Sequence, residues 1–288
     1  MDVEPQEAEI GPQVRFLFGD VVYDEALPPL LDLLAGLDLR ATFFAIGRDA
    51  RSSAGAAWLR RLAEAGHEVA NHTETHPIAW RRLARAEKAR EIDQAHEVLS
   101  AAAGRPVVGF RAPAFDLDRA TLDLLLERGY LYDSSLFPSL ALVPMKGVAR
   151  LAARRWHVGL GRLRDGWAPR GPYVWCRPAG RPCLVELPTS TASWARLPFY
   201  GTITQTWGVR TFAWSLGRLR RGELPIHYSL HLQELAPTPA AVPGYAAPPA
   251  ERRRVLGDAL RRLAQDSRCR TLAELAGEVA ARATGQTP

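Results

Sequence analysis

Two histidines four residues apart form the sharpest chemical pattern in the chain. His72 and His76 enclose the segment Thr-Glu-Thr directly after a β-prone stretch. On a helical turn, or on a loop that leaves a strand, side chains at this spacing can turn toward one ion. The alternative is two surface histidines at the start of a helix. Because imidazole nitrogen is a common ligand of Zn²⁺, the pair is a candidate metal site.

Other polar residues stand where apolar, β-prone runs end. Asp20, Arg111 and Asp133 each follow or end such a run. Late in the chain, His227 and His231 share one face of a predicted strand by parity, but only His231 lies at its carboxyl end. Carboxylates, imidazoles and guanidinium groups are the side chains that transfer protons and hold anions in catalysis.

The elements that must position these residues alternate between strand and helix. Alternation with short connections implies parallel strands joined by right-handed crossovers. No G-x-G-x-x-G follows the first strand, which favours a βα barrel, with its chemistry at the carboxyl ends of the strands, over a dinucleotide fold. Periodicity predicts strands at 14–18, 41–46, 68–71, 107–110 and 130–133, with helices over 27–37, 58–65, 92–99 and 122–126.

The second half of the chain is less regular. Residues 138–173 lose periodicity, and we expect an irregular insertion across one end of the barrel. The sequence predicts an N-terminal tail over residues 1–13 and one domain over residues 14–284. Further predicted elements are strands at 174–177, 184–187 and 226–231, a Pro/Ala-rich loop at 237–249, and closing helices at 253–265 and 271–281.

Composition places the chain among ordinary globular proteins. Apolar residues make up 47% and charged residues 24% of the 288 residues, which excludes disordered, fibrous and disulfide-rich classes. The net charge of +6 raises nucleic acid or anionic lipid as a partner, and the alternative is that the arginines simply line solvated helix faces. Because the arginines are dispersed along predicted helices, no nucleic-acid partner is expected.

The cysteines and the N-terminal residues indicate in which cellular compartment the protein is expected. Cys176, Cys183 and Cys269 form no C-x-x-C pair, so neither a disulfide framework nor a zinc–cysteine site is predicted. The acidic N-terminus lacks the basic and apolar regions of a signal peptide. No apolar run reaches the length of a membrane span. We therefore expect a cytoplasmic protein without a membrane span.

Five segments in order resemble the motifs of one enzyme family. They are similar to those of the polysaccharide deacetylase family, the NodB-homology or carbohydrate esterase family 4 deacetylases. The ordered similarity runs from about residue 14 to 280, with a gap at 138–173. The segments are Thr42–Gly47, Gly66–Pro77, Gly109–Phe115, Tyr132–Ser135 and Tyr228–Leu232.

The resemblance implies a distorted (β/α)7-type barrel. It also implies hydrolysis of an N-acetyl or related amide, usually on a sugar or another small molecule, with a divalent metal such as zinc. His72 and His76 would be two metal ligands, and Asp20 would be a third ligand or the catalytic base. The metal would polarise the amide carbonyl and lower the pKa of the attacking water.

The same resemblance implies the remaining roles. His231 would be the general acid that protonates the leaving amine. Arg111 would hold and orient a catalytic carboxylate, most simply Asp20, because its guanidinium fork suits that task. Pro113 and Phe115 would contact the substrate, and a backbone N–H near Phe115 would stabilise the oxyanion.

The first motif departs from the family pattern of two acidic residues. If the pattern is D-x-D, Asp20 is the base and Val22 replaces the metal ligand; if it is D-D, Gly19 replaces the base and Asp20 is the ligand. The distance to the following segment 23–28 favours the first interpretation. Three hypotheses stay open: a metal-assisted deacetylase, a metal-independent hydrolase of cyclic amides, and an inactive barrel that binds a carbohydrate or a partner protein.

Overall fold

A parallel sheet forms the frame of the molecule. The computed structural model describes residues 2–3, 22–77, 79–141, 163–176, 183–236, 247–265 and 269–283. Within these residues the strands follow the order β1-β2-β3-β4-β5-β7-β6, parallel from β1 to β7, with β6 antiparallel at the edge. The strands are β1 (Asp2–Val3), β2 (Thr42–Ala45), β3 (Glu68–Asn71), β4 (Gly109–Phe110), β5 (Tyr132–Asp133), β6 (Tyr173–Cys176) and β7 (Cys183–Glu186).

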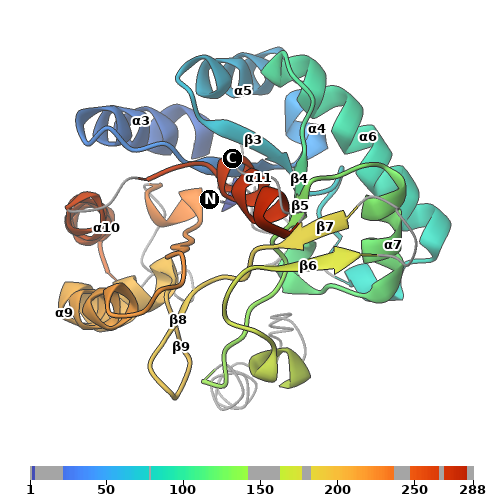
Figure 1. Cartoon of the computed structure of the whole chain (residues 1–288). Helices are drawn as coiled ribbons and strands as arrows, with labels where there is room; N and C mark the ends of the chain where they lie inside the picture. Colours follow the sequence, from blue (N-terminus) through green and yellow to red (C-terminus); the bar gives the residue numbers. More distant parts are fainter. Residues whose placement is uncertain are drawn as a thin grey trace, which may run out of the picture.

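Helices cross over on the outer side of this sheet (Figure 1). Local signals set their ends: the Ser52 and Asp118 side chains accept backbone N–H bonds at the starts of α5 and α7, and Gly104 ends α6 in the left-handed region. No described helix is both long and apolar enough to span a bilayer. The crossover helices are α3 (Leu27–Gly36), α4 (Gly47–Ala50), α5 (Ser53–Glu64), α6 (Arg85–Ala103) and α7 (Arg119–Glu127).

Beyond β7, segments without regular strand structure continue the side of the barrel. The Ser190 N–H donates to the His227 carbonyl at 3.2 Å, and the Gly201 N–H donates to the Ser229 carbonyl at 2.8 Å. The short helix η6 (Leu232–Glu234) then contacts β1. This side of the barrel also carries a small hairpin of β8 (Thr191–Ala192) and β9 (Leu197–Pro198). The predicted α/β class with a distorted barrel is therefore confirmed.

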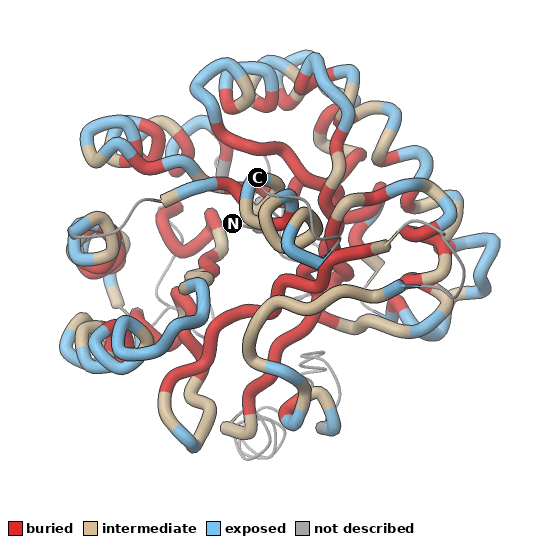
Figure 2. The backbone as a smooth tube through the Cα atoms, viewed as in Figure 1, coloured by how far each residue is buried: buried red, intermediate tan, exposed pale blue. Residues whose placement is uncertain are grey.

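Successive side chains of a strand point to opposite faces of the sheet, so each strand contributes to two apolar layers. On β2, Phe43 packs with leucines of the surrounding helices, whereas Phe44 packs with Tyr132 and the C-terminal helix. Figure 2 shows the central strands as buried, the edge strand β6 as mostly intermediate, and the outer faces of the helices as exposed. A strand buried on both faces explains the continuous apolar run at 42–46.

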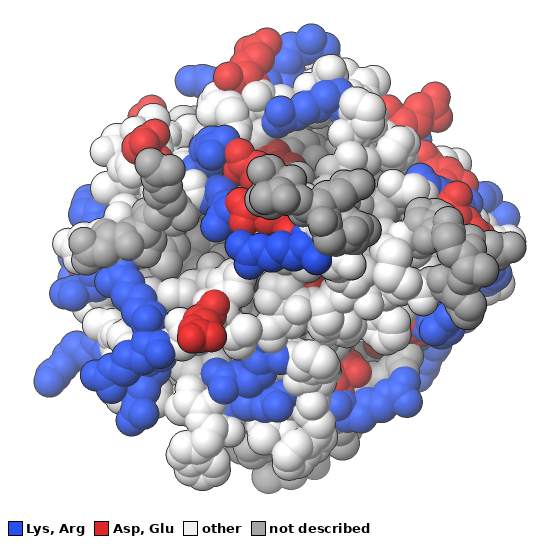
Figure 3. Space-filling view, viewed as in Figure 1, with Lys and Arg blue, Asp and Glu red and all other residues white. Residues whose placement is uncertain are grey.

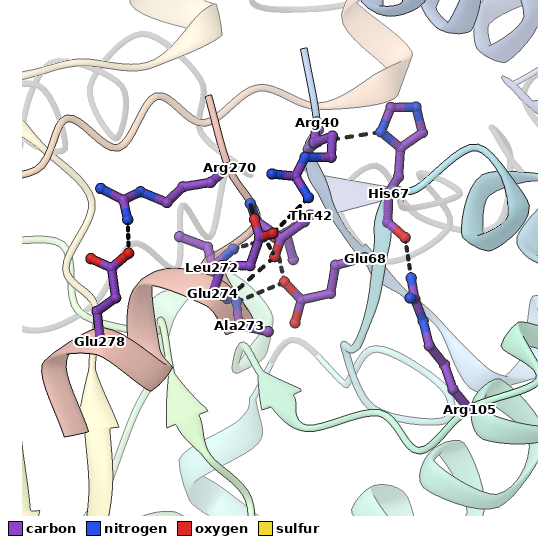
Figure 4. A network of polar contacts seen from close by, with 12 residues as sticks. Arg40, Thr42, His67, Glu68, Arg105, Arg270, Leu272, Ala273, Glu274 and Glu278 are labelled. Carbon is purple, nitrogen blue, oxygen red and sulfur yellow. Dashed lines mark hydrogen bonds and ion pairs between the residues drawn. The ribbon is translucent and has the colours of Figure 1, made fainter. Parts of the chain in front are cut away.

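The C-terminal helix α11 (Leu272–Ala283) closes the amino end of the sheet (Figure 4). Glu68, the first residue of β3, accepts the Thr42 hydroxyl at 2.6 Å, the Tyr132 hydroxyl at 2.8 Å and the Ala273 N–H at 2.9 Å. Burial raises the pKa of the Glu68 carboxyl, while these hydrogen bonds lower it. The buried Glu68 carboxyl thus joins β2, β3 and β5 to α11. Because α11 covers the amino end of the sheet, the candidate site lies at the carboxyl end.

Several predicted elements need correction. The segment 226–231 contributes an isolated bridge at Ser229 instead of a regular strand. The sequence also left out α9 (Gly201–Arg220), whose glycines and threonines weaken the helical signal and which contains non-helical backbone at Gly208. The predicted strand 14–18 lies outside the described residues, and residues 2–3 of the predicted tail form β1. The closing helices are α10 (Pro249–Ala264) and α11.

The expectation about cysteines is wrong in one respect. Cys176 and Cys183 form a disulfide with a Cα–Cα distance of 4.5 Å, because the antiparallel register of β6 and β7 places them opposite one another. Spacing in the sequence did not reveal this cross-strand pairing. Since disulfides persist mainly in oxidising compartments, the bond weighs against the predicted cytoplasmic location.

The disulfide gives a prediction about stability. Replacing both Cys176 and Cys183 with serine should lower the free energy of unfolding by about 2–3 kcal/mol, because a short crosslinked loop restricts the unfolded chain. Thermal unfolding with and without reductant measures it: reductant should lower the Tm of the wild type and of Cys269→Ser, but not that of the double variant. Equal reductant sensitivity in all three would contradict the pairing.

Candidate functional site

The structure brings the two predicted histidine ligands together at the carboxyl end of β3. His72 and His76 are both buried, and their ring centroids lie 4.9 Å apart. The loop is folded by the Asn71 side chain, which accepts the Thr73 N–H at 2.8 Å, and by the Thr73 hydroxyl, which accepts the His76 N–H at 3.1 Å. Positive φ angles of 69° at Thr73 and 55° at His76 turn the chain within this loop, and the two rings pack edge to face.

A backbone carbonyl fixes the tautomer of His72. The His72 Nδ1 lies 2.7 Å from the carbonyl oxygen of Arg111. A carbonyl can only accept, so Nδ1 must carry the hydrogen, and Nε2 of the neutral ring keeps its lone pair. Metal-binding histidines characteristically donate their second N–H to a carbonyl or a carboxylate in this way. The geometry therefore fits His72 as a metal ligand through Nε2.

Arg111 is buried in the same end of the barrel. Its guanidinium donates to the Ser134 carbonyl at 2.9 Å, to the Ser134 hydroxyl at 3.0 Å and to Nε2 of His227 at 3.2 Å. It also stacks over the ring of Phe44, with Cζ 4.1 Å from the centroid. The sequence predicted a contact with Asp20, which lies outside the described residues.

Two buried carboxyls lie side by side at the ends of β5 and β7. Asp133 and Glu186 are register partners, and both are fully buried. Burial raises the pKa of both carboxyls; the neighbouring Asp133 adds to the increase at Glu186, and the charge of Arg111 opposes it. The direction is the one expected for two adjacent acids in a low-dielectric site, because each disfavours the ionised form of the other.

This carboxyl pair supports the turn that presents Arg111. Asp133 accepts the Ser135 hydroxyl at 2.6 Å, and the Ser135 hydroxyl oxygen in turn accepts the Ala112 N–H at 2.7 Å. Glu186 accepts the Leu136 N–H at 3.1 Å. The residue after Arg111 is thus anchored to the carboxyl end of the next strand.

His231 lies beside a hydroxyl and a carboxylate. The Tyr200 hydroxyl is 3.1 Å from Nε2 and 3.2 Å from Nδ1 of its ring. Glu234, one turn of η6 further on, is buried and places Oε1 3.7 Å from Nδ1. A carboxylate at this position stabilises the positive charge of a protonated imidazole.

Pro113 and Phe115 form the short helix η4 (Pro113–Phe115) and are mostly buried. The Phe115 ring packs against Tyr200 at 6.2 Å and against Phe137 at 5.1 Å between centroids. The Phe115 N–H, expected to stabilise an oxyanion, donates to the Ala112 carbonyl at 3.1 Å. In this structure the Phe115 N–H is therefore engaged in a hydrogen bond within the turn.

The first motif lies mostly outside the described residues. This applies to Asp20 and Gly19, while Val22 is described by its backbone alone, at the start of η2 (Val22–Ala26). Within the described ranges, no group of three or more histidine, cysteine or acidic side chains is placed to hold a metal ion. The structure thus places His72 and His76 side by side, and the position of Asp20 is not described.

Sequence reasoning left out three residues that contact the site. Glu186 is an acid at the end of an apolar strand, which could have indicated a buried partner for Asp133. Tyr200 and Glu234 had weaker signals, although Glu234 follows His231 at the i+3 spacing of a helical turn. His227, set aside in favour of His231, contacts the guanidinium of Arg111.

The carboxyl pair predicts an unusual pH dependence of stability. Because burial raises the pKa of Glu186 in the folded state, the folded protein binds this proton more tightly than the unfolded chain does. Wild-type stability should therefore fall as pH rises from the ordinary carboxyl range toward the raised pKa. Glu186→Gln should flatten this slope and raise the free energy of unfolding at neutral pH by about 1–3 kcal/mol.

Urea unfolding of both proteins across the pH range measures this effect. The exposed Glu223→Gln is the matched control, because it removes the same charge from the surface and should keep the wild-type slope. If Glu186→Gln keeps that slope as well, the proton is not held by this pair.

Comparisons with known proteins agree with this geometry. Residues 10–132 match the family model "Polysaccharide deacetylase". A chitooligosaccharide deacetylase of Sinorhizobium fredii is 41% identical over 73 residues, 25% of this chain and 33% of that protein. A peptidoglycan deacetylase of Helicobacter pylori is 30% identical over 112 residues, 38% of this chain and 36% of that protein. The chain thus spans about a third of the length of these curated relatives.

A solved structure extends the likeness of the fold along the chain. A protein from Mycobacterium smegmatis, classed with the polysaccharide deacetylases, superposes with a TM-score of 0.63 at 22% identity, over 93% of this chain and 80% of that one. At this identity the likeness concerns the fold alone. The family match over residues 10–132 and the two curated relatives thus make this chain similar to polysaccharide deacetylases over part of its length.

Proposed function

We propose that this protein hydrolyses the amide bond of an N-acylated sugar, releasing a carboxylic acid and leaving a free amine. The observation that supports it best is the pair of adjacent buried imidazoles, in which the His72 Nδ1 hydrogen is donated to the Arg111 carbonyl. Metal-binding histidines characteristically donate one ring N–H to a carbonyl and bind the metal through the other nitrogen.

A chain of contacts connects this pair to the proposed general acid. The Arg111 guanidinium lies 5.2 Å from the centroid of the Phe115 ring, and that ring packs edge to face against Tyr200. The Tyr200 hydroxyl then contacts His231. The proposed ligands and the proposed acid therefore belong to one continuous cluster.

The residues present fit a divalent metal, zinc by preference, held by His72, His76 and Asp20. Two neutral imidazoles and one carboxylate are a ligand set used by open catalytic zinc sites. When bound, the metal would polarise the acyl carbonyl and make water a stronger nucleophile at neutral pH.

The side chains of this chain supply the proton transfers. In the alternative D-x-D interpretation, Asp20 is the base instead of a ligand: it takes a proton from the attacking water, and Arg111 orients that carboxylate. His231, in its protonated form, gives a proton to the amine nitrogen as the C–N bond breaks. Glu234 supports the charged imidazole before transfer, and the Tyr200 hydroxyl holds the ring in place.

The proposed substrate class is an oligosaccharide that contains N-acetylglucosamine. Two relatives are named for chitooligosaccharide and for peptidoglycan, and both polymers contain this acetylated sugar. Acetylated chitooligosaccharides and soluble peptidoglycan fragments are therefore the first substrates to test.

Zinc titration of the apo-protein tests the proposed ligands. The wild type should bind one zinc ion, and His72→Ala or His76→Ala should weaken binding by at least about tenfold, because each removes one of three protein ligands. Isothermal calorimetry measures this. The control His96→Ala, on α6, should bind zinc as the wild type does.

Two further variants separate the alternatives for the first motif. If Val22 stands where the family has its ligand, Val22→Asp should tighten zinc binding further. If Asp20 is the ligand, Val22→Asp should change nothing and Gly19→Asp should raise the hydrolysis rate. Zinc binding by the wild type that His72→Ala leaves unchanged would overturn the metal assignment.

Acetate release tests the proposed acid. His231→Gln should lower kcat by about 10²–10⁴-fold, the usual contribution of a general acid, while zinc affinity stays unchanged. His96→Gln should retain the wild-type rate. Equal rates for His231→Gln and the wild type would show that another group protonates the amine.

A further inference from the structure

The outer side of α9 carries an unusual combination of exposed residues. Arg210, Trp214, Arg218 and Arg221 follow one another at spacings of four, four and three, which places them on one side of the helix. All four are exposed, as is Trp207 just before the break at Gly208. We call these five residues the α9 outer face. The opposite side packs on α10 through Phe212 and Leu216.

The α9 outer face is positively charged without acidic neighbours on its own helix. Among the described helices of eight or more residues, α9 is the one with no aspartate or glutamate. The neighbouring helix α10 contrasts with it, because Arg254 and Arg261 there both pair with Asp258, at 3.5 and 3.0 Å. Figure 3 shows basic side chains gathered at lower left, on the side of α9 and α10.

Two indole rings accompany the arginines. Trp207 is 44% exposed and Trp214 is 45% exposed, although burying an indole ring is strongly favourable. The Arg218 guanidinium lies over the Trp214 ring, with Cζ 5.5 Å from the centroid. Tryptophan prefers the headgroup level of a bilayer, and arginine pairs with lipid phosphate. An amphipathic helix with these two residue types on its outer side has the composition of an interfacial helix.

We propose that the α9 outer face docks on the surface of an anionic lipid bilayer. Charge complementarity selects the partner, since the arginines would meet lipid phosphates while the indoles enter the headgroup region. α9 begins directly after Tyr200, whose hydroxyl contacts His231, so docking would hold the candidate site close to the bilayer. This inference does not depend on the proposed hydrolysis.

Vesicle co-sedimentation tests the charge requirement. The full-length wild type should bind vesicles of equimolar phosphatidylglycerol and phosphatidylcholine, and bind vesicles of phosphatidylcholine alone far more weakly. The triple variant R210Q/R218Q/R221Q should bind the anionic vesicles about a hundredfold more weakly, at roughly fivefold for each arginine.

The matched control R85Q/R254Q/R261Q removes the same total charge from arginines that are paired with carboxylates. It should keep nearly wild-type binding. An equal loss in the two triple variants would show that net charge alone drives binding and would overturn the α9 assignment, as would failure of the wild type to bind anionic vesicles.

Brominated lipids test insertion of the indoles. They should quench the tryptophan fluorescence of the wild type, and the quenching should fall strongly in W207F/W214F. Duplex DNA serves as the competing polyanion, since it offers phosphates without an apolar layer. Loss of vesicle binding at low DNA concentration, together with absence of bromine quenching, would identify a nucleic-acid surface and overturn the membrane proposal.

Discussion

Arg111 brings a permanent positive charge into a part of the barrel where its side chain is about 1% exposed. Removing a charge from water costs several kcal/mol unless hydrogen-bond acceptors and opposite charge replace the lost hydration. Ser134 supplies two acceptors, His227 supplies a third and Phe44 supplies a ring face. These contacts replace the hydration that the guanidinium loses when it is buried.

The buried carboxyl pair complements that charge. Asp133 and Glu186 would repel one another if both were ionised, and burial raises the pKa of each. The charge of Arg111 opposes these increases, because it stabilises negative charge on either carboxyl. Through Ser135 the pair also holds the backbone of Ala112, so the electrostatic balance and the shape of the Arg111 turn depend on the same atoms.

The two ends of the barrel are joined through adjacent residues of β5. Tyr132 donates to Glu68 at the closed end beside α11, whereas Asp133 takes part in the site at the open end. Because β5 has only these two residues, their side chains take part in both structures.

The sequence by itself determined the strand–helix alternation, the position of β3 and the histidine loop, because periodicity and turn residues act locally. It also indicated the family through motifs that are short and contiguous. Only the tertiary structure decided that Glu186 lies beside Asp133, that Cys176 pairs with Cys183, and that His227 contacts Arg111. These contacts depend on the register between strands and on how the sheet curves. Neither can be read from the hydrophobic periodicity of a single segment.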